Sequence, residues 1–187
     1  GEENILALTG DAPQEGFSGR AKPVYDLDSV LMLDLIRSLR PTGNTDGDKP
    51  EWTPFDFYPG AVVNPYKARE ADQMMHMYKL ELKIATGAQF IITQLGYDLR
   101  KLWELKQYMR REDLDHIPVI PSVYVATATI GRLMQEHRIA GCSMPDALLE
   151  KLKGEKKAQR LERAALQVAA VKSLGFAGAH IGGFGLK

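Results

Sequence analysis

The pattern of hydrophobic and polar residues predicts an alternation of short buried strands and amphipathic helices. Five short runs of apolar or β-branched residues are typical of strands buried on both faces, and they fall near residues 4–8, 58–63, 89–93, 118–123 and 177–181. Between these runs apolar residues recur at helical spacing, most clearly from Leu161 to Leu174, with Gly175 at the expected end. Ser143 followed by Asp146 is typical of a helix N-cap. Residues 41–54 are rich in turn formers and indicate a long loop.

This order of elements favours a parallel sheet built from right-handed βα units. Two architectures fit the pattern, an open doubly wound sheet and an arc of a (β/α)₈ barrel. The turn after the first strand, TGDAPQEG, lacks the G-x-G-x-x-G spacing of Rossmann dinucleotide sites. Polar residues follow several strands, as at the mouth of a barrel, and these are Asp11, Asn64, Gln94 and His180. We therefore expect one α/β domain over residues 1–187, a parallel-stranded TIM-barrel type that is incomplete, with about five strands.

The segment GAQFIITQLGYD, residues 87–98, is the most informative in the chain, because it combines a buried strand, a polar strand end and a helix start. A buried strand from Phe90 to Thr93 leads directly to Gln94, and Asp98 can cap the helix that follows. Ligands bind at the carboxyl ends of parallel strands, so Gln94 is a candidate binding residue. The alternative is that its amide only satisfies backbone groups of the loop.

Composition and charge exclude several classes of function. Lys and Arg number 24, as do Asp and Glu, so the formal charge is zero and no basic stripe indicates nucleic-acid binding. No apolar run approaches the roughly 18 residues of a membrane helix. Cys142 is the single cysteine, which suits a reducing compartment, and we expect a small packing residue rather than a reactive thiol. The four histidines lack metal-ligand spacing, and His180 is expected to be a hydrogen-bonded structural residue. These features predict a soluble, cytoplasmic protein with no membrane or nucleic-acid partner.

Three segments resemble the methylenetetrahydrofolate reductase family. NILALTGD at residues 4–11 is similar to that family's N-[IV]-L-A-L-R-G-D strand, and LELKIATGAQFIITQLGYD at residues 80–98 to its segment ending in T-Q-x-x-x-D. IPVIPSVYV at residues 117–125 resembles a third strand, and the similarity runs to about Ile181. The resemblance implies a (β/α)₈ barrel that uses FAD and a reduced nicotinamide, or another electron donor, to interconvert 5,10-methylenetetrahydrofolate and 5-methyltetrahydrofolate in one-carbon metabolism.

The resemblance also implies roles for two strand-end residues. Asp11 matches an aspartate near the flavin and the folate, where a carboxylate stabilises the iminium cation formed when the methylene bridge opens. Its alternative role is to cap the following loop. Gln94 matches the glutamine that hydrogen-bonds the pterin, because an amide both donates and accepts.

The flavin contacts implied by the resemblance are altered in this chain. Lys83 matches a lysine associated with the flavin phosphates, although a lone lysine on a long helix is commonly solvated surface. His76 falls closest to the place of the family's ribityl-binding aspartate. Thr9 and Asn64 stand where family members typically have Arg and Tyr. These departures indicate a divergent branch of the family.

The expected function therefore has alternatives of different classes. The family's catalytic glutamate lies on a strand before those present here, and a complete barrel takes about 250 residues. We expect a fragment, or a subunit that another chain completes, inactive alone and self-associating through open edge strands. The main hypothesis is a flavin-dependent oxidoreductase acting on a tetrahydrofolate derivative. The alternatives are a non-catalytic barrel subunit or interaction module of a folate or methyl-transfer complex, and the folate-binding domain of a methyltransferase.

Overall fold

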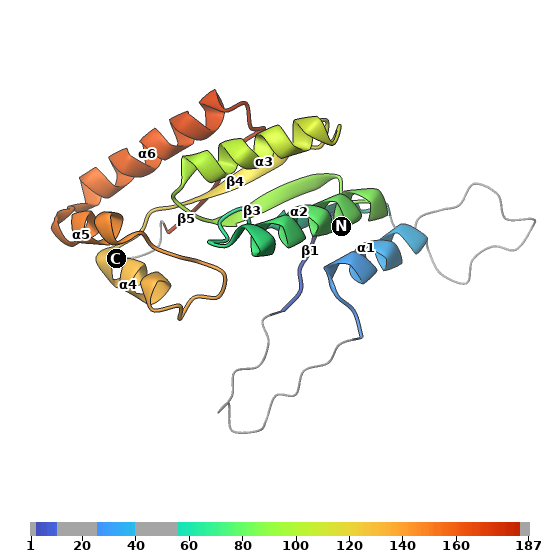
Figure 1. The fold of residues 1–187 in the computed structure, drawn as a ribbon, viewed down its shortest axis with the longest axis horizontal. Helices are drawn as coiled ribbons and strands as arrows, with labels where there is room; N and C mark the ends of the chain where they lie inside the picture. The colour runs from blue at the N-terminus through green and yellow to red at the C-terminus, as the bar shows by residue number, and fades with distance from the viewer. Residues whose placement is uncertain (1–2, 11–25, 40–55, 184–187) are drawn as a thin grey trace, which may run out of the picture.

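A computed structural model describes residues 3–10, 26–39 and 56–183, and these build a parallel sheet covered by helices (Figure 1). The strands are β1 (Asn4–Ala7), β2 (Tyr58–Val63), β3 (Phe90–Leu95), β4 (Val119–Tyr124) and β5 (His180–Gly182). The helices are α1 (Ser29–Ser38), α2 (Glu70–Thr86), α3 (Leu99–Arg111), α4 (Ala128–Gln135), α5 (Asp146–Gly154) and α6 (Lys157–Ser173). None of these helices has the length and apolar character needed to cross a membrane. The predicted loop at residues 41–54 lies outside the described residues.

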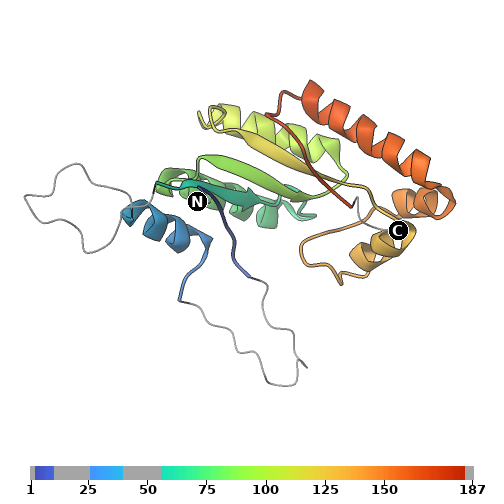
Figure 2. The ribbon, with the colours of Figure 1, turned by 180° about the vertical axis from the view of Figure 1, so that it is seen from behind.

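The sheet has the topology of a barrel arc. Its strand order is β1-β2-β3-β4-β5, and every neighbouring pair is parallel. The strands curl into a half-barrel with α1, α2, α3 and α6 on one face, and Figure 2 shows the other face without a helix. A doubly wound sheet carries helices on both faces. The predicted incomplete TIM-barrel type is therefore confirmed.

The main core lies between the sheet and its helices. Alternate strand residues face the helices, so Ala61, Ile91 and Val123 are fully buried. The helices supply the opposing side chains, which include Leu80 on α2, Leu102, Leu105 and Met109 on α3, and Val171 on α6. Burying one such side chain contributes about 1.5–3 kcal/mol. This core fixes the strands, and with them the positions of the residues at their carboxyl ends.

A second, smaller core joins α4 and α5. It contains Ala126, Met134, Cys142, Met144, Leu149 and Leu152. Cys142 is only 5% exposed, so its expected role as a packing residue is confirmed. The expected N-cap at Ser143 is wrong, because Pro145 takes the N-cap position of α5 and no side chain caps that helix. Proline favours this extended conformation directly before a helix, and its φ is −62° here.

A β-bulge interrupts β3 beside Gln94. Ile92 pairs with Ile120 and Leu95 pairs with Ser122, so three steps along β3 match two along β4. Side chains bridge the gap, because Ser122 N donates to Thr93 Oγ1 at 3.1 Å and Ser122 Oγ donates to Thr93 O at 2.7 Å. Bulges redirect side chains and are frequent near functional sites. The bulge thus includes Gln94, which lies in β3 between the two pairing positions.

Candidate functional site

The carboxyl ends of the strands meet at one edge of the sheet, and two amide side chains converge there. Asn64 follows β2 directly, and Gln94 is the next-to-last residue of β3. Both reach the segment between α4 and α5. Asn64 Nδ2 donates to Gly141 O at 2.9 Å, and Gln94 Nε2 donates to Ala140 O at 3.4 Å. The structure thus brings together two of the predicted site residues and adds a segment that the sequence did not indicate.

The Gln94 amide is held in one orientation and keeps capacity to bind. Its Oε1 accepts from Leu95 N at 2.8 Å, while its Nε2 donates to Ala140 O. Reversing the amide would break both bonds. An amide carries two N–H donors and two oxygen lone pairs, so one donor and one lone pair remain uncommitted among the described residues. Gln94 therefore satisfies loop backbone groups and can still bind a ligand that both donates and accepts.

Gly141 allows the segment to approach the two amides. Its φ is +70°, in the left-handed region that glycine adopts without strain. A Cβ at this position would lie 3.0 Å from Gln94 Nε2 and 3.4 Å from Asn64 Nδ2. Any side chain here would displace the Gln94 amide. Gly141 is thus a residue of the site, and its only sequence signal is a glycine in the connection between two predicted helices.

Asn64 belongs to a buried polar network at the end of β2. It is 8% exposed, and its Oδ1 accepts from Tyr66 N at 3.0 Å. Its main-chain O accepts from Gln73 Nε2 at 3.4 Å, and Gln73 Oε1 accepts from Lys67 N at 3.1 Å. These bonds join the β2 end to α2. The predicted cofactor residue Asn64 therefore orients loops in this structure.

A cationic cluster lies where β1 and β2 separate. The β1–β2 pairing ends at Ala7 and Ala61, and Lys83 Nζ donates to the next carbonyl, Val62 O, at 2.6 Å. Lys83 is 9% exposed, contrary to the solvated surface common for such lysines. Burial, aided by the charge of Lys79, lowers the pKa of Lys83 to about 8. This buried lysine holds its proton less tightly than a surface lysine.

Lys79 and His76 extend the cluster along the same face of α2. Lys79 Nζ donates to Asp28 Oδ2 at 2.8 Å, and this bond is the main cause that lowers the pKa of Asp28 to about 2. Burial, with the nearby lysines, lowers the pKa of His76. His76, Asp28 and Lys79 line a groove of about 720 Å³ between α1 and α2, with otherwise mainly apolar walls. The spacing of residues 76, 79 and 83 on one helix face was the signal that could have revealed this cluster.

The remaining predicted residues have separate positions. Asp11, the expected catalytic residue, lies outside the described residues. Thr9 Oγ1 accepts from Ser29 N at 3.0 Å, at the start of α1. His180 Nδ1 lies 3.2 Å from Ser122 Oγ, its neighbour in the β4–β5 pairing, as expected for a hydrogen-bonded structural histidine. The described residues contain no group of three or more His, Cys, Asp or Glu that could hold a metal ion.

Comparisons with known proteins point to one family. The family model described as methylenetetrahydrofolate reductase matches residues 1–181. Methylenetetrahydrofolate reductase 2 of Schizosaccharomyces pombe is 27% identical over 173 residues, covering 83% of this chain and 24% of that protein. The chain thus spans about a quarter of the length of this relative.

A solved structure shares the fold. An uncharacterized protein from Clostridium thermocellum that binds two copies of 5-methyl-5,6,7,8-tetrahydrofolic acid matches with a TM-score of 0.51 and 16% identity. The match covers 81% of this chain and 62% of that one. At this identity the similarity concerns the arrangement of strands and helices.

Proposed function

Because the chain belongs to the methylenetetrahydrofolate reductase family, we propose that it forms folate-binding and flavin-binding parts of an oxidoreductase. The reaction is the interconversion of 5,10-methylenetetrahydrofolate and 5-methyltetrahydrofolate. The observation that carries the proposal is the fixed Gln94 amide at the carboxyl edge of a barrel-type sheet. The folate-binding neighbour of the same fold supports a folate derivative as the ligand.

Gln94 is proposed to recognise the pterin ring. A pterin edge presents donors and acceptors side by side, and the uncommitted N–H and lone pair of Gln94 match that pattern. The bonds to Ala140 O and Leu95 N hold the amide before the ligand arrives, so little ordering is needed on binding. Asp11 is proposed to stabilise the cationic methylene group electrostatically.

The cationic cluster fits the anionic half of a flavin dinucleotide. Lys79 and Lys83 face one carboxylate, Asp28, which leaves the cluster net positive. The Lys83 ammonium uses one of its three donors on Val62 O, so two remain for a phosphate. His76 and Thr9 are proposed to contact the same cofactor. A flavin bound here would carry the hydride between the electron donor and the folate.

A folate-binding module without redox activity is the second candidate. The observation that favours it is Asn64, which stands where the family typically has a tyrosine near the flavin. Its amide is committed to Gly141 O and Tyr66 N. In that case the protein would bind folate through Gln94 without holding a flavin.

Flavin absorbance and folate titration separate the two candidates. The purified full-length protein should show a flavin band near about 450 nm and bind 5-methyltetrahydrofolate. Gln94→Ala should raise the folate Kd about fivefold, because a neutral hydrogen bond contributes about 1 kcal/mol. Gln89→Ala, at the amino end of the same strand segment, is the control and should leave the Kd unchanged. Folate binding without flavin selects the module, and absence of folate binding contradicts both candidates.

A further inference from the structure

The outer surface of α2 carries an apolar stripe. Every exposed residue of this helix after Glu70 belongs to it, and in order they are Ala71, Met75, Tyr78, Leu82 and Ala85. The three large side chains among them are 66%, 54% and 57% exposed. Their spacing alternates between four and three positions, which is the seam pattern of a helix that packs against another helix. Such a stripe on a solvent-facing helix surface indicates a site of interaction.

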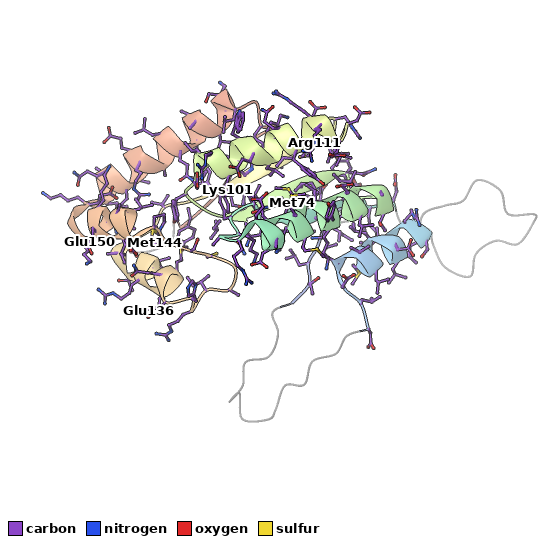
Figure 3. The ribbon with its side chains drawn as sticks, viewed as in Figure 1. Met74, Lys101, Arg111, Glu136, Met144 and Glu150 are labelled. Carbon is purple, nitrogen blue, oxygen red and sulfur yellow. The ribbon has the colours of Figure 1, made fainter. Side chains whose placement is uncertain are left out.

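Helix α1 widens this surface. Leu31 and Leu35 lie one helical turn apart and are 50% and 43% exposed. Leu31 and the three large residues of the α2 stripe also line the groove of about 720 Å³ between the two helices. Figure 3 views this layer of helices from its outer side and labels Met74, the neighbour of Met75 on α2. Because the surface faces away from the sheet, it is separate from the amide site at the carboxyl ends of the strands.

The α2 stripe is nearly the same when it is read from either end. Tyr78 is its central residue, Met75 and Leu82 flank it, and an alanine stands at each end. A second α2 that runs antiparallel across the stripe therefore sets Tyr78 against its own counterpart, Met75 against Leu82, and alanine against alanine. A two-fold axis between identical chains requires a self-complementary surface of this kind.

The charged residues beside Tyr78 have partners within the same chain. Lys79 Nζ donates to Asp28 Oδ2 at 2.8 Å, and the carboxylate of Glu81 accepts from the Tyr108 hydroxyl. The formal charge of the whole chain is zero. Two copies that meet at the stripe therefore do not bring unpaired like charges together, which would otherwise oppose their association.

We propose that this surface of α1 and α2 pairs with the same surface of a second copy of the chain, with the two α2 helices antiparallel. Its five large side chains, three on α2 and two on α1, expose on the order of several hundred Å² of apolar area in each copy. A standard interface takes about 800 Å² from each partner. The surface thus supplies the apolar centre of such an interface, and the polar residues around it supply the rim. The sheet edges take no part in this contact.

The test is a charge exchange across the two-fold axis. Sedimentation velocity measures the dimer Kd of the 187-residue chain in the Ile181→Lys background, which opposes pairing of the sheet edges. Met75→Glu and Leu82→Lys should each raise the Kd at least about a hundredfold, because symmetry buries each unpaired charge twice. The two substitutions combined should restore the Kd to within about tenfold of the starting value, because opposite charges then meet between the copies. Within one helix these positions are about 10 Å apart along the axis, too far to pair.

Leu166→Glu is the matched control. Leu166 on α6 is 66% exposed, as Met75 is, and lies outside the proposed surface, so its substitution should leave the Kd unchanged. Circular dichroism of each variant shows that the chain is folded. An equal effect of Leu166→Glu, or a weakened dimer that the combined substitutions do not restore, overturns the two-fold contact. A chain that stays monomeric at every concentration overturns it too, and binding of that monomer to neutral phosphatidylcholine vesicles would assign the stripe to a lipid surface instead.

Discussion

At the residue scale, Gly141 sets the positions of the two amide side chains of the site although it has no side chain itself. Its carbonyl accepts from Asn64, and its missing Cβ leaves room for the Gln94 amide. The segment therefore approaches Gln94 closely enough for the neighbouring Ala140 carbonyl to orient that amide. We therefore expect residue 141 to affect binding at the proposed folate site, although it offers no side chain to the ligand.

Gly141→Ala should weaken folate binding and destabilise the protein. The φ of +70° strains an alanine, and its Cβ would force the Gln94 amide to move. We expect a loss of about 1 kcal/mol or more in the free energy of unfolding, with a raised folate Kd. Denaturant unfolding and folate titration measure the two effects. Gly154→Ala, where a Cβ meets open space, is the control, and an equal effect there would contradict the steric argument.

Lys83 should give the protein a pH-dependent stability. Its pKa is about 8 in the folded chain, against 10.5 for an unperturbed lysine, so the unfolded chain binds more protons between these values. Its contribution to the free energy of unfolding therefore rises with pH, by at most about 1.4 kcal/mol per pH unit within that window. Urea unfolding from pH 7 to 10 should show this rise in wild type relative to Lys83→Met. Lys151→Met, on α5, is the control for removing a lysine elsewhere, and its pH dependence of unfolding should match that of wild type. Parallel wild-type and Lys83→Met curves would contradict the buried-ammonium interpretation.

Among the elements, α1 depends on one carboxylate at its start. Asp28 Oδ1 accepts from Val30 N and Leu31 N at 2.9 and 3.0 Å, and its Oδ2 pairs with Lys79 of α2. The same side chain therefore caps α1 and ties it to α2. The ion pair includes Lys79 of the cationic cluster, which is proposed to bind the anionic half of the flavin dinucleotide.

Asp28→Ala should destabilise the protein by about 1–2 kcal/mol, because the helix loses its cap. Asp28→Asn keeps an oxygen that accepts from the helix amides and removes only the charge. Its effect should be smaller, since partly exposed ion pairs contribute about 0.2–1 kcal/mol. Chemical denaturation measures the loss in the free energy of unfolding for each substitution. Faster hydrogen exchange in α1 would show that the loss arises in this helix. Equal effects of the two substitutions would mean that the ion pair, and not the cap, holds α1.

The strands and helices were largely predictable from sequence because their signals are local. Hydrophobic periodicity located every described strand, although β5 begins at His180, three residues later than expected. The β3 bulge and the contact with Ala140 and Gly141 were not predictable. Gln94 and Ala140 are 46 positions apart, and nothing local specifies which carbonyl meets which amide. Residue types at the site could therefore be identified from sequence, while their orientation required the tertiary structure.

On the scale of the whole molecule, the half-barrel has two edge strands. Within the described residues β1 pairs only with β2, and β5 only with β4. Edge strands with unpaired backbone groups favour pairing with another chain. The expectation of self-association stands as a prediction.

The 187-residue chain should elute from gel filtration as a species larger than a monomer. Ile181→Lys should shift it toward the monomer, because a lysine on an edge strand opposes pairing. Leu166→Lys removes an even more exposed apolar side chain, on α6 and away from the strand edges, and should not change the elution. A monomeric wild-type chain would show that the edges do not associate.

The contacts made by the amides of Asn64 and Gln94 also bear on how the chain folds. Their partners lie 77 and 46 residues further along the sequence, so closing these loops requires much of the chain to be in place. Contacts of such long range form slowly compared with helices. A nascent chain therefore gains the oriented Gln94 amide only after Ala140 has been synthesised and its carbonyl has reached the end of β3. Folate binding during refolding would then report the completion of the fold, and the appearance of helical structure would precede it.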